Sequence, residues 1–264
     1  MSFLIVQELS AGYGKETVLE KLSFSLEAGE LLGVIGANGC GKTTLLKAIC
    51  GILPHEGVCT LDGTVLEEVP AKTIAKLASY IPQRSGISID ISALDVVLMG
   101  FNPRLGLLEQ PSKAMRDIAL QTLRQVGLEG KEECNYLHLS EGQKQLCILA
   151  RTLVAGSRLL LLDEPESALD FRFRHEMLWL LRAWVKEQNR SAVVTLHDPS
   201  LALNFCHKLL LLDGGKVLGI LQPQKDTLED MEQLLSKVYG SVSLQRCQNR
   251  KGETQLIMLK EENL

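Results

Sequence analysis

An eight-residue run, Gly36-Ala-Asn-Gly-Cys-Gly-Lys-Thr43, constrains the fold of this chain more than any other part of the sequence. It matches the pattern G-x-x-x-x-G-K-[ST] at every fixed position. Residues 31–35 before it form an apolar run that is typical of a buried strand, and residues 44–50 after it have the pattern of a helix. A strand, a glycine-rich loop and a helix in this order predict a loop that binds phosphate at a helix N-terminus.

The residue types in this loop explain why it would bind phosphate. Its glycines lack a Cβ atom, so the backbone can fold tightly and turn its N–H groups inward. The following helix adds the partial positive charge of its N-terminus at the same point. Lys42 would reach the β- and γ-phosphates of a nucleotide, and the Thr43 hydroxyl would hold Mg²⁺. The residues expected to bind nucleotide here are Gly36, Ala37, Asn38, Gly39, Cys40, Gly41, Lys42, Thr43 and Thr44.

Two acidic residues follow a second apolar strand. Four leucines at 159–162 are typical of a strand buried on both faces of a parallel sheet, and Asp163 and Glu164 come directly after them. Ligands bind at the carboxyl ends of such strands, so we expect Asp163 to hold Mg²⁺ through water and Glu164 to polarise the attacking water. Of the five histidines, His197 alone follows a predicted core strand, 191–196, although a structural histidine is the alternative.

Two further side chains are candidates by position. Gln83 ends a predicted strand at 79–83 and could reach the Mg²⁺ shell, but a solvated loop glutamine is the simpler interpretation. Tyr13 lies in a predicted turn at 11–14. Its ring would either stack on an adenine or lie half-buried in the turn.

Composition excludes several classes of protein. A net charge of −4 and a pI of about 5.8 do not favour a protein that binds a nucleic-acid backbone. Seven scattered cysteines without a C-x-x-C pair favour free thiols in a reducing cytosol over a disulfide framework or a zinc site. We expect neither a signal peptide nor a membrane helix, because no window approaches roughly 18 uncharged apolar residues. Any role at a membrane would need a partner that spans it.

The order of the elements predicts an α/β fold in one domain. A mostly parallel sheet with flanking helices would form the core, with an N-terminal antiparallel β subdomain and an inserted helical subdomain. We place the core and antiparallel subdomain at 1–83 and 156–221, the helical subdomain at 84–155 and a mixed tail at 222–264. Strands are expected at 3–9, 17–26 and 58–63, helices at 95–100, 115–126 and 143–154, and a hairpin at 208–220. The segment 99–108 is expected to be a loop, either a surface for another protein or a plain connection.

Taken together, these residues resemble the ATP-binding subunit of an ABC transporter, from about residue 3 to about residue 244. Leu139-Ser-Glu-Gly-Gln143 is similar to the family signature L-S-G-G-Q, and Ser167-Ala-Leu-Asp170 is similar to the loop that follows the acidic pair. Gln83, Tyr13 and His197 match the glutamine loop, the adenine-stacking aromatic residue and the switch histidine of that family.

The resemblance implies an ATPase that works as a homodimer, with ATP and Mg²⁺ as cofactors. Two subunits would close head to tail, so that each ATP lies between the phosphate loop of one chain and the signature of the other. Ser140 and the Gly142 amide would contact the γ-phosphate across the dimer, and Gln143 and Asp170 would also belong to the nucleotide site. His197 would contact the γ-phosphate from its own chain.

Three segments resemble the ATPases of metal-chelate importers, which take up iron–siderophore complexes, haem or vitamin B12. They are Asp95-Val-Val-Leu-Met-Gly-Phe-Asn-Pro103, Leu196-His-Asp-Pro-Ser-Leu-Ala-Leu203 and Val238-Tyr-Gly240. This likeness implies two transmembrane permease subunits as partners, a periplasmic or surface substrate-binding protein that acts indirectly, and no nucleic acid. The protein would then be peripheral, at the cytoplasmic face of the cell (inner) membrane.

A soluble ABC ATPase of an assembly complex, such as iron–sulfur cluster scaffolding, is the alternative. A DNA-repair or translation ATPase is disfavoured, because the sequence lacks a coiled-coil insertion, a second nucleotide unit and a basic face. Two positions depart from the family pattern. Glu141 replaces the first glycine of the signature, which requires a backbone that a non-glycine residue can adopt, and Glu166 stands where the family usually has threonine.

Overall fold

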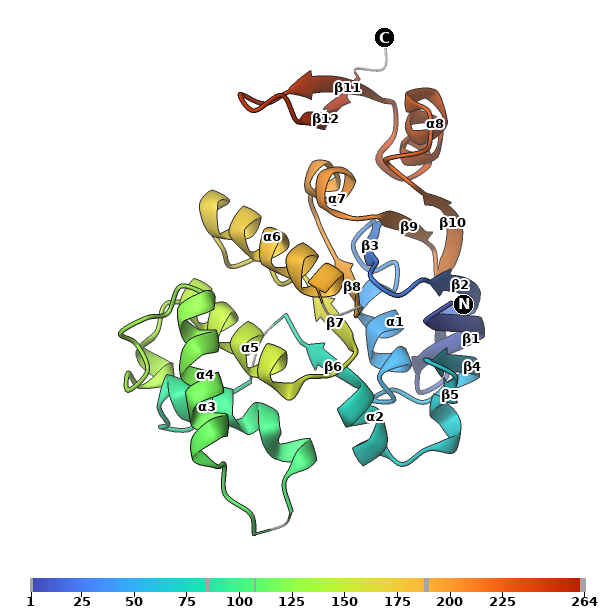
Figure 1. Cartoon of the computed structure of the whole chain (residues 1–264). Coiled ribbons are helices and arrows are strands. Elements are labelled where there is room, and N and C mark those ends of the chain that lie inside the picture. The colour runs from blue at the N-terminus through green and yellow to red at the C-terminus, as the bar shows by residue number, and fades with distance from the viewer. Residues whose placement is uncertain (1, 84–85, 107, 188–189, 262–264) are drawn as a thin grey trace.

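The centre of the molecule is a six-stranded sheet in the order β10-β9-β3-β8-β7-β6 (Figure 1). The computed structural model describes residues 2–83, 86–106, 108–187 and 190–261. Strands β9 to β6 are parallel, and β10 pairs with β9 in the antiparallel sense. The strands are β3 (Leu31–Gly36), β6 (Ala78–Ile81), β7 (Leu159–Asp163), β8 (Ser191–Thr195), β9 (Lys208–Asp213) and β10 (Lys216–Leu221).

Both faces of this sheet are buried, because its inner strands are almost uninterrupted apolar runs. In β7, Leu160 and Leu162 face a core shared with the helices α3 to α8, whereas Leu159 and Leu161 face a second core that contains α1. The predicted strand at 159–162, buried on both sides, is thereby confirmed.

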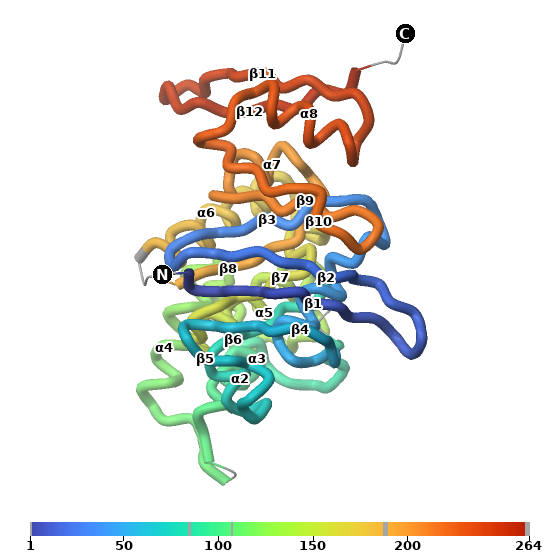
Figure 2. The backbone as a smooth tube through the Cα atoms, turned by 90° about the vertical axis from the view of Figure 1, so that its right-hand side faces the viewer, coloured from blue at the N-terminus to red at the C-terminus, as the bar shows by residue number. Residues whose placement is uncertain are grey.

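A second, antiparallel sheet lies across α1 from the first. Helix α1 (Lys42–Ile49) contacts β1 and β2 on one side and β3, β7 and β8 on the other (Figure 1). Figure 2 shows the molecule from the side on which β1, β2 and β4 lie. The order in this sheet is β2-β1-β4-β5, formed by β1 (Leu4–Tyr13), β2 (Glu16–Leu26), β4 (His55–Leu61) and β5 (Thr64–Val65). The 3₁₀ helix η1 (Leu66–Glu68) and helix α2 (Ala71–Leu77) continue from it to β6.

The predicted turn at 11–14 is wrong. Strand β1 continues to Tyr13, which pairs with Glu16, and the turn falls at Gly14, which has a φ of 62°. The strand is longer because it pairs on both edges, with β2 and with β4. The pair Ala11–His55 also makes β4 begin three residues before the predicted start at residue 58.

Helices α3 (Ala93–Leu98), α4 (Lys113–Gln125) and α5 (Glu141–Ala155) pack together beside the core and fall within 84–155 (Figure 1). The loop predicted from residue 99 is wrong in its first part, since Met99–Arg104 forms the 3₁₀ helix η2. Gly100 packs so closely on α5 that a Cβ there would lie 2.1 Å from the Arg151 carbonyl oxygen. The domain boundaries remain a prediction.

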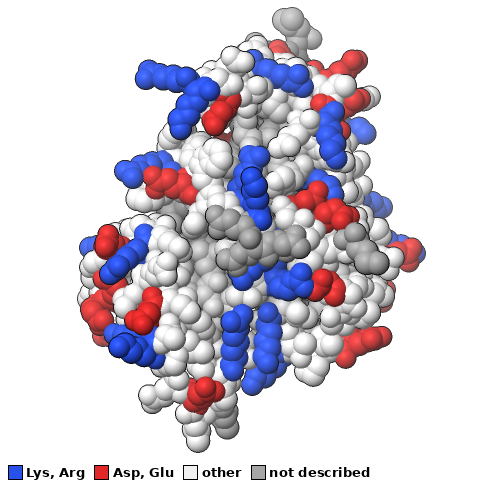
Figure 3. Space-filling view, in the orientation of Figure 1, with Lys and Arg blue, Asp and Glu red and all other residues white. Residues whose placement is uncertain are grey.

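The last part of the chain is the mixed tail that the sequence predicted. It contains α8 (Leu228–Tyr239), β11 (Val242–Gln248) and β12 (Thr254–Lys260), above α7 (Pro199–Phe205) in Figure 1. The remaining elements are the 3₁₀ helix η3 (Tyr136–His138) and α6 (Phe171–Glu187). Among the described residues, no helix has the length and apolarity needed to cross a bilayer. Basic and acidic side chains are interspersed over most of the face in Figure 3.

Candidate active site

The glycine-rich loop connects β3 to α1 in a conformation that its glycines alone permit. Gly41 has a φ of 105°, and a Cβ there would lie 2.4 Å from Leu19 Cδ2. At Gly36, a Cβ would lie 2.0 Å from the Leu212 carbonyl oxygen. Gly41 is also the N-cap of α1 and offers no side chain to its first amides, so these amides are available to an anion.

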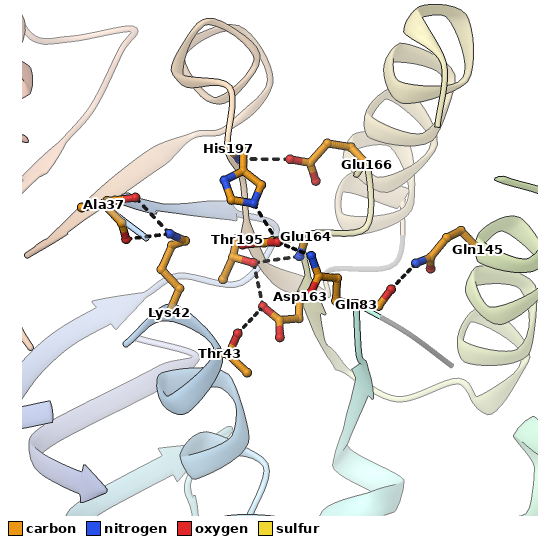
Figure 4. A network of polar contacts seen from close by, with 11 residues as sticks. Ala37, Lys42, Thr43, Gln83, Gln145, Asp163, Glu164, Glu166, Thr195 and His197 are labelled. Atoms are coloured by element: carbon orange, nitrogen blue, oxygen red, sulfur yellow. Dashed lines mark hydrogen bonds and ion pairs between the residues drawn. The ribbon is translucent and has the colours of Figure 1, made fainter. Parts of the chain in front are cut away.

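Lys42 places its positive charge inside this loop. The side chain is buried, and its Nζ donates to the carbonyl oxygens of Gly36 at 2.9 Å and Ala37 at 3.1 Å (Figure 4). An ammonium group and a helix N-terminus therefore converge on one point, which is the arrangement that phosphate oxygens require.

Asp163 joins the loop to the end of β7. Its Oδ1 accepts hydrogen bonds from the Thr43 and Thr195 hydroxyls, both at 3.0 Å, and its Oδ2 accepts one from the Tyr80 hydroxyl at 3.2 Å. The structure thus brings together Thr43 and Asp163, two of the predicted metal ligands. A hydroxyl and a carboxylate are oxygen donors of the kind that Mg²⁺ takes. Burial and the adjacent Asp163 carboxylate raise the pKa of Tyr80, so its phenol stays protonated as a donor.

Glu164 is held in a backbone conformation that is rare for its residue type, with a φ of 48°. Its N–H donates to Thr195 Oγ1 at 2.8 Å. Its Oε2 accepts from Gln83 Nε2 at 2.6 Å and lies 2.7 Å from His197 Nε2 (Figure 4). Gln83, after β6, and His197, after β8, therefore fix this carboxylate, and both are predicted site residues. Thr195, the last residue of β8, fixes only the Glu164 backbone.

Glu166 contacts the backbone of His197. It is 3% exposed, and its Oε1 accepts the His197 backbone N–H at 3.0 Å (Figure 4). Burial raises the pKa of this carboxyl above its ordinary value. The departure from threonine at this position thus replaces a small side chain by an acceptor that holds the backbone of His197.

The loop and Glu164 line one pocket of about 280 Å³. Tyr13 stands at its rim with half of its surface exposed, where a ring could stack on a ligand. The predicted residues Gly36, Ala37 and Cys40 belong to the loop but do not line this pocket. The pocket is lined by Tyr13, Val18, Asn38, Gly39, Gly41, Lys42, Thr43, Thr44 and Glu164.

The signature residues lie apart from this pocket, at the start of α5. This helix packs in the core on the other face of the sheet from α1, and the two helices are well separated in Figure 1. Ser140 and Gln143 form a capping box, with Gln143 N–H on Ser140 Oγ at 3.2 Å and Ser140 N–H on Gln143 Oε1 at 3.1 Å. Glu141 begins the helix with an ordinary backbone and pairs with Lys144 at 2.8 Å.

The loop at 167–170 lies beside these signature residues. A Cβ on Gly142 would lie 3.3 Å from the Ala168 carbonyl oxygen, so the glycine fits closely against that loop. Asp170 accepts the Phe173 N–H at 3.0 Å and so caps the start of α6. Ser140, Gly142, Gln143 and Asp170 therefore form a second group of predicted residues, away from the phosphate loop of their own chain.

Three contacts in the site were not predicted from the sequence. Tyr80 and Thr195 lie at the ends of β6 and β8, the strands that flank β7, so their positions at strand ends were the available signal. Gln145 donates to the Gln83 carbonyl oxygen at 2.5 Å and connects α5 to the site (Figure 4). Nothing in the local sequence around Gln145 indicates this contact.

Comparisons with known proteins identify the family of this chain. Residues 19–167 match the family model described as ABC transporter. The hemin import ATP-binding protein HmuV of Vibrio parahaemolyticus is 35% identical over 244 residues, covering 90% of this chain and 91% of that protein. The hemin import ATP-binding protein HmuV of Deinococcus radiodurans is 38% identical over 223 residues, covering 83% and 84% respectively.

A solved structure extends the likeness to the whole chain. It is described as an inward-facing metal-chelate type ABC transporter. The TM-score is 0.82 at 27% identity, with 99% of each chain covered.

Proposed function

Because this chain belongs to the ABC transporter family and is an ATPase of that family, we propose that it powers the import of a metal chelate through a separate transmembrane permease. An iron–siderophore complex, haem or cobalamin is the class of cargo. The hemin-import relatives and the metal-chelate transporter structure support this proposal over nearly the full chain. The observation that carries it is the Glu164 carboxylate, fixed by Gln83 and His197 on the same pocket as Lys42.

The polar side chains in and beside this pocket can be assigned roles in phosphoryl transfer. Lys42 and the first amides of α1 would bind the β- and γ-phosphates, and Tyr13 would stack on the adenine. Thr43, Asp163 and, from its loop, Gln83 would hold Mg²⁺, which supplies charge neutralisation to the phosphate oxygens when bound. Glu164 would orient the attacking water and accept its proton. His197 would exchange its contact with Glu164 for one with the γ-phosphate.

A second copy of the chain would complete the site. Ser140 and Gly142 lie apart from the pocket of their own chain, so a head-to-tail homodimer is the arrangement in which they can reach a nucleotide. The uncapped amides at the start of α1 and the N-terminus of α5 would then face the same γ-phosphate from opposite sides.

The surface around η2 of this chain is suited to docking of the permease. A groove of about 360 Å³ runs between this element, α2, β6 and α5. Met99, Asn102 and Pro103 line it together with Tyr80, whose hydroxyl reaches Asp163. Docking here would place the chain at the cytoplasmic face of the membrane and connect the permease to the nucleotide site. A substrate-binding protein would act through the permease.

The hydrolytic role is tested with Glu164→Gln. This change keeps the shape of the side chain and removes the base, so we expect turnover to fall on the order of 10²- to 10⁴-fold while ATP affinity is retained. Phosphate release and nucleotide binding are the measurements. Glu229→Gln, an exposed acid in the first turn of α8, is the matched control. Undiminished turnover in the Glu164 variant would remove this residue as the base.

The transport role is tested by co-purification from a gentle detergent extract. We expect two hydrophobic permease subunits to accompany the ATPase, and a groove variant, Asn102→Arg, to lose them while it keeps ATP binding. Soluble scaffold proteins in place of the permease would support the assembly-complex alternative, which the import-type relatives do not favour.

A further inference from the structure

Three side chains with metal-ligating atoms meet at the antiparallel sheet. His55 and Cys59 lie on β4, and Glu67 lies on η1, directly after β5. One ligand atom of each lies within 4.8 Å of the other two. The spacing of the cysteines did not indicate a zinc site, since this cluster has one thiol and is assembled by the pairing of β4 with β5.

The imidazole of His55 is oriented as it is in metal sites. Its Nδ1 lies 3.4 Å from the Leu53 carbonyl oxygen, and its Nε2 lies 2.8 Å from Glu67 Oε1. A neutral imidazole carries one N–H, yet both nitrogens here face acceptors. A backbone carbonyl at Nδ1 is the usual outer partner of a metal-bound histidine, and it leaves the Nε2 lone pair for a cation.

Glu67 Oε1 has two nitrogen neighbours, His55 Nε2 and the Cys59 backbone N–H. The Cys59 backbone N–H also donates to Oε1, at 2.9 Å, and the Cys59 thiol lies within the same cluster. The thiol is fully buried, while the side chains of His55 and Glu67 are 8% and 29% exposed. An ion could therefore enter past Glu67, and the cluster would shield it on the other sides.

We propose that His55 Nε2, Cys59 Sγ and Glu67 Oε1 bind a divalent ion of the Zn²⁺ class, with water as the fourth ligand. A thiolate, an imidazole and a carboxylate form a donor set that suits Zn²⁺ and not Mg²⁺ or Ca²⁺. Bond lengths of about 2.0–2.3 Å require His55 Nε2 and Glu67 Oε1 to separate by a few tenths of an ångström. Binding of the ion by Cys59 requires the thiolate, so the thiol proton is released to solvent when the ion binds.

The site adjoins the nucleotide pocket. His55 pairs with Ala11 on β1, two residues before Tyr13, and His55 and Tyr13 line the same hollow of about 550 Å³. A bound ion would fix the end of this strand pair. The site itself is independent of the proposed transport role, because its ligands bind no part of the nucleotide.

The test is a Co²⁺ titration of the full, reduced chain, previously treated with a chelator, in excess Mg²⁺ and without nucleotide. We expect one equivalent to bind with a thiolate-to-metal charge-transfer band, and one equivalent of Zn²⁺ to abolish the band by displacement. Cys59→Ser should remove the band. Glu67→Gln and His55→Gln, which keep the thiol, should weaken binding by at least about tenfold, a loss of the size that outer-shell changes alone produce.

Control variants separate this cluster from other ligands. Cys247→Ser removes the exposed thiol on β11, and His197→Ala removes the histidine beside Glu164, so both should keep the full band. Circular dichroism identifies any variant that fails to fold. If Cys59→Ser fails to fold, weaker Co²⁺ binding by Glu67→Gln and His55→Gln tests the same site. The absence of a thiolate band in the wild type, or a band that survives Cys59→Ser and is lost in Cys247→Ser, would overturn the proposal.

Discussion

Glu166 is a buried acid two residues after Glu164, and its burial lowers the stability of its ionised form. One oxygen accepts the His197 N–H, whereas Oε2 is buried without a hydrogen-bond partner among the described residues. Such an atom destabilises the ionised form, which agrees with the raised pKa of this group. Glu166 therefore holds the His197 backbone, but its ionised form lowers the free energy of unfolding of the protein.

This balance makes the stability of the protein depend on pH in a defined direction. A carboxyl with a raised pKa binds its proton more firmly in the folded state, so the stability it contributes is lost as pH rises from its ordinary value of 4.5 through its folded pKa. Glu166→Gln removes this loss and keeps the acceptor for His197. We expect the melting temperature of the variant to exceed that of the wild type by a few degrees at pH 7 and to match it near pH 4. A difference that is independent of pH would contradict this explanation.

At the scale of elements, the tail is attached to the helix that follows His197. Asn204 on α7 donates to the Leu256 carbonyl oxygen at 2.8 Å and accepts the Leu256 N–H at 2.9 Å, as a strand neighbour of β12 would. Ser200 accepts the Met258 N–H at 3.3 Å, and Asp198 caps the same helix. The hairpin of β11 and β12 therefore restrains α7 and, through it, the position of His197.

Asn204→Ala should release this hairpin without unfolding the core. The change removes three hydrogen bonds, one to Ser200 within α7 and two to Leu256. Loss of the two to Leu256 costs about 1–3 kcal/mol, and this cost should fall on the local opening of β12. Hydrogen exchange of the Leu256 and Met258 amides is the measurement. Gln245→Ala, an exposed change on β11, is the control. Unchanged protection of the Leu256 amide would show that Asn204 does not hold the hairpin.

At the scale of the whole molecule, the phosphate loop and the signature helix lie in different cores of one chain. In the proposed dimer, one chain alone would supply the phosphate loop of one nucleotide site and the signature of the other, and would complete neither. The proposed head-to-tail dimer therefore predicts that nucleotide drives dimerisation, because the N-terminus of a second α5 would add its partial positive charge at the γ-phosphate.

A change at the helix cap tests the dimer. In the Glu164→Gln background, ATP should convert the 29.1 kDa monomer to a dimer in sedimentation experiments. Ser140→Asp keeps the N-cap of α5 but sets a carboxylate against the phosphate, so we expect dimerisation to be lost and ATP binding to remain. Ser140→Asn, an equally good cap without charge, should still dimerise. Equal dimerisation of both variants would place the signature outside the interface.

Much of the fold was accessible from the sequence because its signals are local. Uninterrupted apolar strands, the glycine loop and the acidic pair after the 159–162 leucines are contiguous patterns, and β3, β7 and β8 lie where they predicted. The errors lie where pairing between distant segments sets the length of an element. Strand β1 was extended by β2 and β4, and η2 was ordered by its packing on α5.

The sequence by itself determined the phosphate loop, the acids beside it and the α/β order, because the backbone requirements of each are met within a few neighbouring residues. Only the tertiary structure decided which groups share the site. Thr43 meets Asp163 across 120 residues, Glu166 meets the His197 backbone across 31, and Cys59 joins His55 and Glu67 through the folding of β4, β5 and η1. Such contacts depend on strand register and side-chain burial, which no local pattern records.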